Sequence, residues 1–222
     1  MVLVFDVDDT LYKEKDYVRS GFMAVARSLS PILGKSPKLL NGRLIELLQQ
    51  QGRGKVFDSL LKAHGKLSRR LVRRCVSCYR LHEPKIHLHK AGKNCLHRFR
   101  HLPLYIVTDG NKIAQSAKVR ALDLDSKVKK IFITHRYGVR YAKPSPHCFW
   151  IIQKLERVYT SRILYVGDNP DKDFVGIRSH GFRTLRVLTG PYSKVKARPG
   201  HDAEFQVSTL NELTPEFLKQ LE

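Results

Sequence analysis

The chain has 222 residues and a formal net charge of +21, and 42% of its residues are hydrophobic. A chain of this length and composition can bury a full core, with room for one globular domain and a modest insert. No apolar run approaches the roughly 20 residues that a membrane span needs. The first apolar run starts at Val2 and leaves no room for a signal peptide, and four cysteines do not suggest a disulfide framework. We therefore expect a cytoplasmic protein without a membrane partner.

The basic charge is concentrated in one part of the chain. The segment from Arg19 to Arg100 contains 19 lysine and arginine residues against three acidic ones, so about a third of the chain carries +16 of the net charge. Such an asymmetry indicates a separate unit that faces something anionic.

The first eleven residues contain the strongest local pattern. The apolar residues 2–5 run directly into Asp6, Asp8, Asp9 and Thr10. A run this short is typical of a strand buried on both faces, and ligands bind at the carboxyl ends of the strands in an open parallel sheet. Taken alone, the segment could equally be a strand end followed by a turn, because aspartate lowers strand propensity.

The next segment has apolar residues at helical spacing. It predicts helices around 18–29, 40–48 and 55–63, and a fourth that begins at Ser68 as its N-cap. The pair Ser30-Pro31 should end or bend the first of these helices. One face of the fourth is apolar, and the opposite face carries Arg69, Arg70, Arg73 and Arg74. This basic face has three interpretations: a solvated surface, a funnel for a multiply charged metabolite, or a contact for nucleic acid or another polyanion.

Cys75 and Cys78 are followed by four histidines and Cys95, which raises the possibility of a zinc site. The spacing between the pairs is irregular, however, and both cysteines of the first pair fall on the apolar face of a predicted helix. Cysteines are common in protein cores. We therefore interpret these two as core residues and segment 79–84 as a linker.

From residue 104 onward strands alternate with helices. We expect strands at 104–107, 131–134, 163–166, 184–188 and 204–207, and helices at 111–121, 146–159 and 171–180 and at the C-terminus. This alternation indicates right-handed crossovers and a parallel sheet covered on both faces.

The acid-bearing strand end at Asp6 recurs along this part of the chain. The apolar run 104–107 ends in the letters TDGN, the run 163–166 ends in GDNP, and Lys143 lies between them. Each could be structural on its own, since Lys143 could be a solvated surface lysine, Thr108 a turn residue and Asp168 the start of a helix. It is their joint occurrence that indicates a functional site.

Together these segments resemble the haloacid dehalogenase-like hydrolases, a family made up mostly of magnesium-dependent phosphatases. Asp6-x-Asp8-x-Thr10 matches the first family motif, Thr108 the second, Lys143 the third, and Gly167-Asp168 with Asp173 the fourth. The resemblance covers nearly the whole chain. It implies an α/β fold: a doubly wound, Rossmann-like parallel sheet formed by residues 1–13 and 81–222, with an inserted helical cap domain at residues 14–80.

The resemblance also implies a role for each motif residue. Mg²⁺ would be held by Asp6, Asp168 and the backbone carbonyl of Asp8, with Asp173 in support. Asp6 would be the nucleophile that forms an aspartyl-phosphate. Asp8 would protonate the leaving oxygen and then deprotonate the attacking water. The residues expected at the substrate are Thr108, Asp109 and Lys143.

The expected reaction is hydrolysis of a phosphate ester. Dehalogenases that resemble this fold lack the second aspartate, here Asp8, because a halide leaving group needs no proton. The core motifs look most like the branch that contains N-acylneuraminate-9-phosphatase and nucleotidases, which suggests a small phosphorylated metabolite, either a sugar phosphate or a nucleotide. One alternative is a phosphomutase. The other is a nucleic-acid or polyanion-binding protein that uses the basic insert, although few aromatic residues lie among its arginines to stack on bases.

Overall fold

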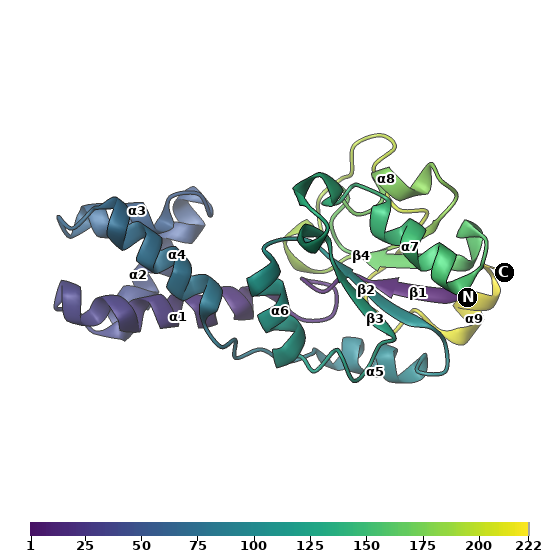
Figure 1. Ribbon diagram of the computed structural model, residues 1–222, viewed down its shortest axis with the longest axis horizontal. Helices are drawn as coiled ribbons and strands as arrows, with labels where there is room; N and C mark the ends of the chain where they lie inside the picture. Colours follow the sequence, from purple (N-terminus) through teal and green to yellow (C-terminus); the bar gives the residue numbers. More distant parts are fainter. Residues whose placement is uncertain (222) are drawn as a thin grey trace. The chain divides into compact units, whose positions relative to one another are not determined.

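The computed structural model describes residues 1–221 and divides the chain into two compact units (Figure 1). The first unit consists of Met1–Glu14 together with the chain from His87 onward, and the second consists of Lys15–Ile86. The insertion thus leaves the first unit after the loop that follows the first strand.

Within residues 1–221, six parallel strands form one sheet in the order β3-β2-β1-β4-β5-β6. The strands are β1 (Val2–Phe5), β2 (Leu104–Thr108), β3 (Lys130–Ile133), β4 (Ile163–Gly167), β5 (Arg183–Val187) and β6 (Phe205–Val207). The chain builds outward from β1 through β2 to β3, and then returns to the other side of β1 with β4. The strand order therefore reverses between β1 and β4, and in open α/β sheets ligands bind at such a switch point.

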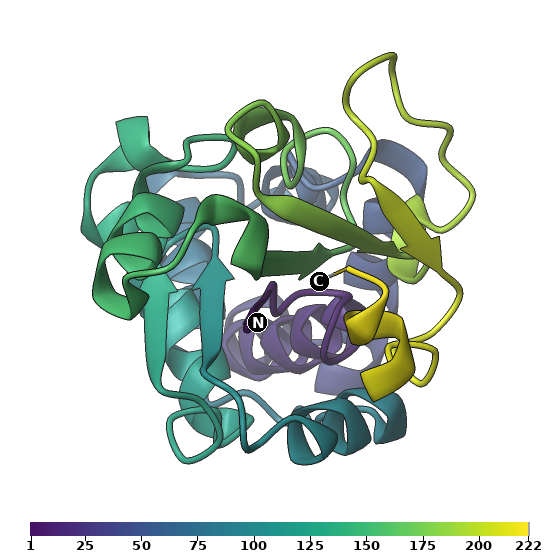
Figure 2. The same cartoon turned by 90° about the vertical axis from the view of Figure 1, so that its right-hand side faces the viewer.

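Both faces of the sheet are covered by helices (Figures 1 and 2). Successive side chains of a strand point to opposite faces, so Val2, Val4 and Tyr165 lie on one face, in the apolar cluster that includes residues of α7 (His147–Glu156) and α8 (Val175–Arg178). On the other side of the sheet lies α5 (Lys90–Arg98), which buries residues of its own. The predicted doubly wound α/β fold is confirmed.

The remaining helices of this unit are α6 (Lys112–Ala121) and α9 (Pro215–Lys219), and short 3-10 turns occupy Thr134–Arg136, Val139–Tyr141, Thr160–Arg162 and Gly190–Tyr192. Helix α6 begins after Asn111, whose side chain accepts hydrogen bonds from the N–H groups of Ile113 and Ala114. Such an N-cap satisfies N–H groups that have no partner within the helix. The cap therefore sets the start of α6 directly after the TDGN segment.

Helix α8 is shorter than the helix predicted over 171–180, because the residues before it adopt a turn. The Asp173 side chain accepts the backbone N–H of Asn169 at 2.9 Å, and the Asp173 N–H donates to the Asn169 carbonyl at 3.0 Å. Local hydrogen bonds of this kind compete with a helical backbone. The turn positions the side chains of Asp168 and Asp173 instead of extending the helix.

The second unit is made of helices that pack around one apolar cluster, and it contains α1 (Glu14–Leu33), α2 (Pro37–Gln51), α3 (Val56–Ala63) and α4 (Arg69–Leu81). Glu14, the first residue of α1, belongs to the first unit. Helix α1 continues past Pro31 to Leu33, and Gly34 follows it at a φ of 61°. A proline near the last turn removes only one helical hydrogen bond, so the helix ends at the glycine. Ser68 caps α4 as predicted, accepting the N–H of Leu71 at 3.3 Å.

Helix α5 was not predicted. The linker interpretation covers only residues 79–84, and no element is predicted between there and residue 104. The cap of α5 is a residue that seldom signals a helix start: the Nδ1 of His89 accepts the N–H of Gly92 at 2.8 Å. Because α5 belongs to the first unit, the basic segment 19–100 crosses the boundary between the units.

Cys75 lies in the apolar cluster of the second unit, and Cys78 packs against that cluster. Burial raises the pKa of the Cys75 thiol to about 11. A thiol with so high a pKa is neither a ready metal ligand nor a nucleophile, which fits the interpretation of a core cysteine. No helix within residues 1–221 is both long enough and apolar enough to span a membrane.

Candidate active site

The site begins where β1 and β4 end side by side. Asp6 follows β1 directly, and its N–H donates to the carbonyl of Val166 in β4 at 2.8 Å. Asp168 follows Gly167, the last residue of β4. Carboxylate oxygens of Asp6, Asp168 and Asp173 all lie within 4.8 Å of one another, and all three residues are buried. The switch point of the sheet thus carries a compact group of acidic side chains.

Glycine at position 167 makes this packing possible. A Cβ atom there would lie 2.6 Å from Oδ2 of Asp173, far inside van der Waals contact. A larger residue would displace Asp173 from beneath the end of β4.

The three carboxylates strongly affect one another's protonation. Burial, with repulsion from Asp173 and Asp6, raises the pKa of Asp168 to about 9. Burial also raises the pKa of Asp6 to about 6, against the opposing charge of Lys143. Buried carboxylates that repel one another in this way are stabilised by a bound cation, and oxygen ligands are those that Mg²⁺ prefers. The donor set therefore fits a divalent magnesium ion.

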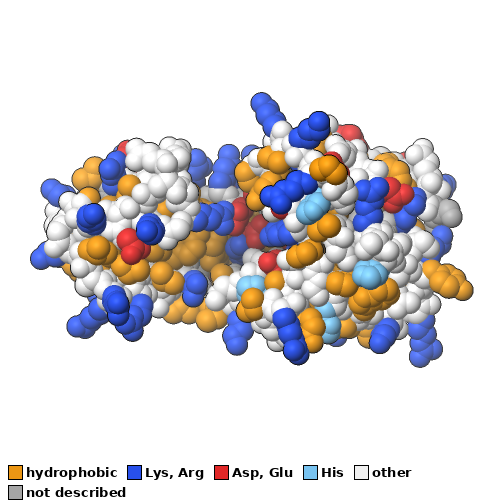
Figure 3. Space-filling view, turned by 90° about the horizontal axis from the view of Figure 1, so that it is seen from above, with side chains coloured by type: hydrophobic (Ala, Val, Ile, Leu, Met, Phe, Trp, Pro, Cys, Tyr) orange, Lys and Arg blue, Asp and Glu red, His pale blue; other side chains and the backbone are white. Residues whose placement is uncertain are grey.

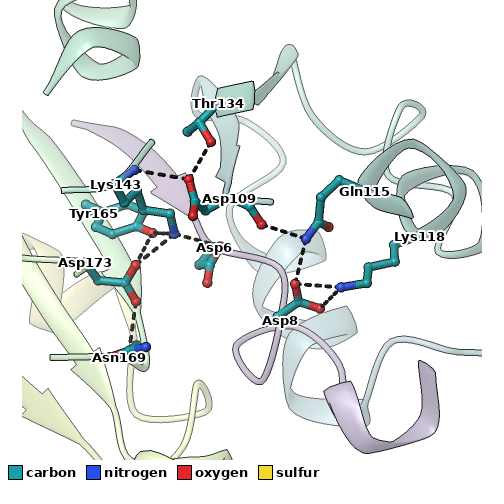
Figure 4. Close-up of polar contacts among 10 residues, drawn as sticks. All are labelled: Asp6, Asp8, Asp109, Gln115, Lys118, Thr134, Lys143, Tyr165, Asn169 and Asp173. Atoms are coloured by element: carbon teal, nitrogen blue, oxygen red, sulfur yellow. Dashed lines mark hydrogen bonds and ion pairs between the residues drawn. The ribbon is translucent and has the colours of Figure 1, made fainter. Parts of the chain in front are cut away.

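Lys143 supplies the buried positive charge of the same group (Figure 4). Its Nζ lies 2.9 Å from Oδ1 of Asp6 and 2.8 Å from Oδ1 of Asp173, and it donates to the hydroxyl of Tyr165 at 2.6 Å. Burial alone would lower the pKa of Lys143, but the charges of Asp173 and Asp6 outweigh it and raise this pKa. The lysine therefore stays protonated. Its charge also lowers the pKa of Asp173 in spite of burial.

Thr108 ends β2 beside this group and is fully buried, yet its Oγ1 has no hydrogen-bond partner within the described residues. The same holds for Oγ1 of Thr10. A buried hydroxyl without a partner costs about 1–3 kcal/mol, and proteins seldom leave such groups unsatisfied. The Thr108 hydroxyl thus keeps an unused capacity to donate a hydrogen bond.

The Asp109 side chain is engaged within the protein. Its Oδ1 accepts the hydroxyl of Thr134 at 2.5 Å and the backbone N–H of Lys143 at 3.1 Å. These bonds hold the segment that carries Lys143 against the end of β2. Direct contact between Asp109 and a substrate stays a prediction.

Asp8 belongs to a second network, formed with α6 (Figure 4). Lys118 donates to both carboxylate oxygens, and Gln115 and Tyr12 donate one hydrogen bond each. Burial alone would raise the pKa of Asp8, but the charge and hydrogen bonds of Lys118, with those of Tyr12 and Gln115, lower it. Asp8 is therefore ionised in the ligand-free protein.

The sequence analysis did not identify Lys118, Gln115 or Tyr165. Gln115 and Lys118 are three residues apart on a helix, a spacing that places side chains on one face, but only the structure shows that this face meets Asp8. Tyr165 could have drawn attention as the one hydroxyl in the apolar strand ILYVG. Nothing in the sequence marks its contact with Lys143.

A family model described as haloacid dehalogenase-like hydrolase matches residues 1–181. The chain belongs to this family. Two curated relatives are named glyceraldehyde 3-phosphate phosphatase. One, from Methanocaldococcus jannaschii, is 26% identical over 95% of this chain and 92% of its own length. The other, from Methanopyrus kandleri, is 27% identical over 95% of this chain and 94% of its own length.

Solved structures of this family share the fold. A HAD phosphatase from Thermococcus onnurineus has a TM-score of 0.60 and 23% identity, and the match covers 98% of this chain and 97% of that one. A HAD-hydrolase from Bacillus subtilis, solved with bound magnesium, has a TM-score of 0.66 and 20% identity, with 96% of both chains covered. These likenesses extend over both units of this chain.

Proposed function

We propose that this hydrolase is a magnesium-dependent phosphatase that cleaves a small phosphate monoester through an aspartyl-phosphate on Asp6. The observation that carries the proposal is the meeting of three buried carboxylates with Lys143 at the switch point of the sheet, beside the unpartnered Thr108 hydroxyl. The relatives named glyceraldehyde 3-phosphate phosphatase make a triose phosphate the first substrate to test. They suggest this in preference to the larger N-acylneuraminate 9-phosphate.

The residues of the site can hold both the ion and the phosphate. Asp6, Asp168 and the backbone carbonyl of Asp8 would hold Mg²⁺, with Asp173 in support. The ion, when bound, supplies positive charge that offsets the repulsion between an anionic nucleophile and the phosphoryl oxygens. Lys143 and the Thr108 hydroxyl would bind the non-bridging oxygens, one by charge and one by a hydrogen bond.

Two displacements at phosphorus complete the reaction. In the first, an Asp6 oxygen bonds to phosphorus while the bond to the leaving alcohol breaks, and Asp8 gives its proton to the alcohol oxygen. The negative charge of a bound substrate favours the protonated form of Asp8 that this step needs. In the second, Asp8 takes a proton from water as the water oxygen attacks phosphorus, and the bond to Asp6 breaks. Asp8 is then protonated for the next turnover.

The helical unit Lys15–Ile86 is proposed as the cap that selects the substrate. It carries 16 lysine and arginine residues against four acidic ones, and basic side chains are scattered over its visible surface on the left of Figure 3. This excess charge is the observation that keeps a polyanion-binding protein as a second candidate function. A polyanion would be attracted to this surface without needing the buried carboxylates.

The proposal is tested by measuring phosphate release after the protein has been stripped of metal and reloaded with Mg²⁺. The panel contains glyceraldehyde 3-phosphate, larger sugar phosphates, nucleotides, a short oligonucleotide and 4-nitrophenyl phosphate. We expect turnover of a small monoester that stops in excess chelator and in Asp6→Asn, since an amide cannot replace the nucleophile.

Asp123→Asn is the matched control, because Asp123 is an exposed aspartate distant in sequence from every motif. It should retain full activity. Undiminished activity of Asp6→Asn would overturn the proposed mechanism. Substrate conversion without free phosphate would indicate a phosphomutase, and salt-sensitive oligonucleotide binding without any turnover would indicate the polyanion-binding protein.

A further inference from the structure

The carboxylate of Asp8, in the loop after β1, is paired with a buried lysine. Lys118 lies on α6 and only 4% of its side chain is exposed. Lysine is almost never buried unless its charge is paired. Here its Nζ reaches Oδ1 of Asp8 at 2.7 Å and Oδ2 at 2.8 Å. Its Nζ also lies 4.0 Å from Oε1 of Glu14, so the shortest contacts of the buried charge are those with Asp8.

Two further donors complete the contact. Nε2 of Gln115 donates to Oδ2 of Asp8 at 2.9 Å, and the hydroxyl of Tyr12 donates to Oδ1. Both oxygens of Asp8 are thus engaged, and the donors come from two sides: α6 and the loop after β1. Figure 4 shows the Asp8 side chain directed towards α6, in a network separate from that of Asp6 and Lys143. Rotation of the Asp8 carboxylate would break several charge-assisted hydrogen bonds at once.

Helix α6 is itself fixed beside the carboxyl end of β2. Its N-cap, Asn111, follows the segment after β2, and Nε2 of Gln115 also donates to the backbone carbonyl of Asp109 at 2.8 Å. One side chain therefore links Asp8 to the end of the strand that carries Thr108. The position of Asp8 is tied to the edge where the phosphate is expected.

We propose that Lys118, with Gln115 and Tyr12, is the positioning residue for Asp8 and holds the carboxyl group in the one orientation from which it can exchange a proton with the leaving alcohol. This inference rests on the proposed phosphatase function and adds to it a residue outside the family motifs. In this proposal Lys118 does not contact the substrate. It acts through Asp8, and a catalytic group misplaced by about 1 Å can cost roughly 100-fold in rate.

The inference also concerns the class of leaving group. An aryl phosphate with an acidic phenol departs without protonation, whereas an alkyl phosphate such as a sugar phosphate needs a proton on the leaving oxygen. In the first displacement, a device that fixes Asp8 matters only for the second class, whereas the attack of water in the second displacement needs Asp8 with either class. Loss of this device should therefore slow the first displacement for esters of aliphatic alcohols and spare it for esters of acidic phenols.

The test is a single-turnover measurement of alcohol or phenol release with excess enzyme and saturating Mg²⁺, which reports the first displacement alone. Lys118→Met keeps the length of the side chain and removes the charge. Relative to wild type, we expect an unchanged rate with 4-nitrophenyl phosphate, and about 10–100-fold slower release from phenyl phosphate and from the best alkyl phosphate. Apparent substrate affinity should change little.

A double-mutant cycle separates positioning from a general structural effect. If Lys118 acts through Asp8, adding Lys118→Met to Asp8→Ala should cause no further loss on the alkyl phosphate. The matched control is Lys127→Met, which also removes a Lys–Asp ion pair, Lys127 to Asp123, but at the surface. It should leave all rates unchanged. Tyr12→Phe removes a single donor and should give a weaker loss with the same leaving-group dependence, even if Lys118→Met does not fold.

Several outcomes would overturn the inference. A loss in Lys118→Met that is equal for good and poor leaving groups, or that adds fully to the loss of Asp8→Ala, would show a general structural role. Unchanged or faster alkyl phosphate cleavage would show that the network restrains Asp8 away from its working position. A wild-type protein that cleaves no phosphate ester at all would instead refute the proposed function on which the inference rests.

Discussion

The two units of this protein use basic side chains in opposite ways. In the first unit, Lys118 and Lys143 are only 4% and 7% exposed, and each forms ion pairs with specific aspartates. In the second unit, Arg69, Arg70 and Arg73 lie exposed on α4, in a unit with few acidic residues. Buried pairs fix geometry, whereas exposed charges are screened by solvent and salt. Net charge therefore says little about where the chemistry takes place.

Among changes to these basic side chains, the largest effect is expected from Lys143→Met, which removes the buried positive charge beside Asp6. We expect the rate constant of turnover to fall by about 10²–10³-fold, as is typical when a charge-stabilising donor is lost from an active site. Steady-state phosphate release from the best substrate measures this effect. Activity within a fewfold of wild type would remove the distinction between buried lysines and exposed arginines on which the account depends.

Asp168→Asn should separate stability from function. Magnesium at about 100 times its dissociation constant stabilises a native protein by roughly 2.7 kcal/mol, so wild type should melt at a higher temperature with the ion than without it. In Asp168→Asn this shift should vanish together with activity. The metal-free variant should be more stable than metal-free wild type, because burial beside two other acidic side chains makes ionisation of Asp168 costly and asparagine carries no charge. A magnesium shift that survives in the variant would place the ion elsewhere.

The stability difference between metal-free Asp168→Asn and metal-free wild type should change with pH in one direction. Burial and its acidic neighbours raise the pKa of Asp168 from an ordinary value of 3.8 to about 9. In metal-free wild type the unfolded chain releases this proton near pH 4 and the native protein near pH 9, so the native state loses relative stability as the pH rises through that window. Asparagine does not titrate. The melting-temperature advantage of metal-free Asp168→Asn should therefore grow with pH, and an advantage that shrinks would contradict the assigned burial.

A smaller effect is expected from Tyr165→Phe. The change keeps the ring in the core and removes only the hydroxyl that contacts Lys143 and Asp173. One hydrogen bond to a charged group contributes about 1.5–3 kcal/mol at most, and less where other partners remain. Because Lys143 keeps both carboxylates, we expect a loss of roughly threefold to tenfold in turnover. A loss as large as that of Lys143→Met would show that the tyrosine has a direct role.

The smallest effect on turnover is expected from the triple variant Arg69→Ala, Arg70→Ala and Arg73→Ala. It spares Arg74, whose side chain donates to Ser28 at 3.0 Å. Turnover of a small substrate at saturation should stay within about twofold of wild type, because solvent-exposed charges act mainly on encounter and are screened by salt. Titrations at two salt concentrations check this. A selective loss on one class of anion would assign the arginines to binding that anion.

Sequence patterns were informative where local chemistry decides the structure. Apolar runs that end at Asp6, Thr108 and Gly167 predicted the central strands and the edge at which acidic residues meet, because parallel strands all end on the same side. The serine cap of α4 was also predicted from the sequence. Helix α5 was not, because the imidazole of His89 takes the place of an ordinary capping side chain.

Contacts between distant segments could not be predicted in the same way. The pair of Lys118 with Asp8 spans 110 residues, and an isolated lysine on a helix is ordinarily a solvated one. Only the tertiary fold, which sets α6 against the loop after β1, shows that this lysine is buried and paired. The family motifs identify the groups expected at the phosphate, whereas Lys118 and Gln115, which contact one of those groups, come from a helix without a motif.

The most direct test of the central claim is to trap the phosphoryl group on the protein. Asp8→Asn lacks the base for the second displacement, and 4-nitrophenyl phosphate needs no acid for the first, so the two together should let the intermediate accumulate. After an acid quench, mass spectrometry of the digested protein should locate one phosphoryl group on Asp6, only with Mg²⁺ and not in the double variant Asp6→Asn, Asp8→Asn. Release of nitrophenol by Asp8→Asn without any phosphoryl group on the protein, or with that group on another residue, would contradict the account.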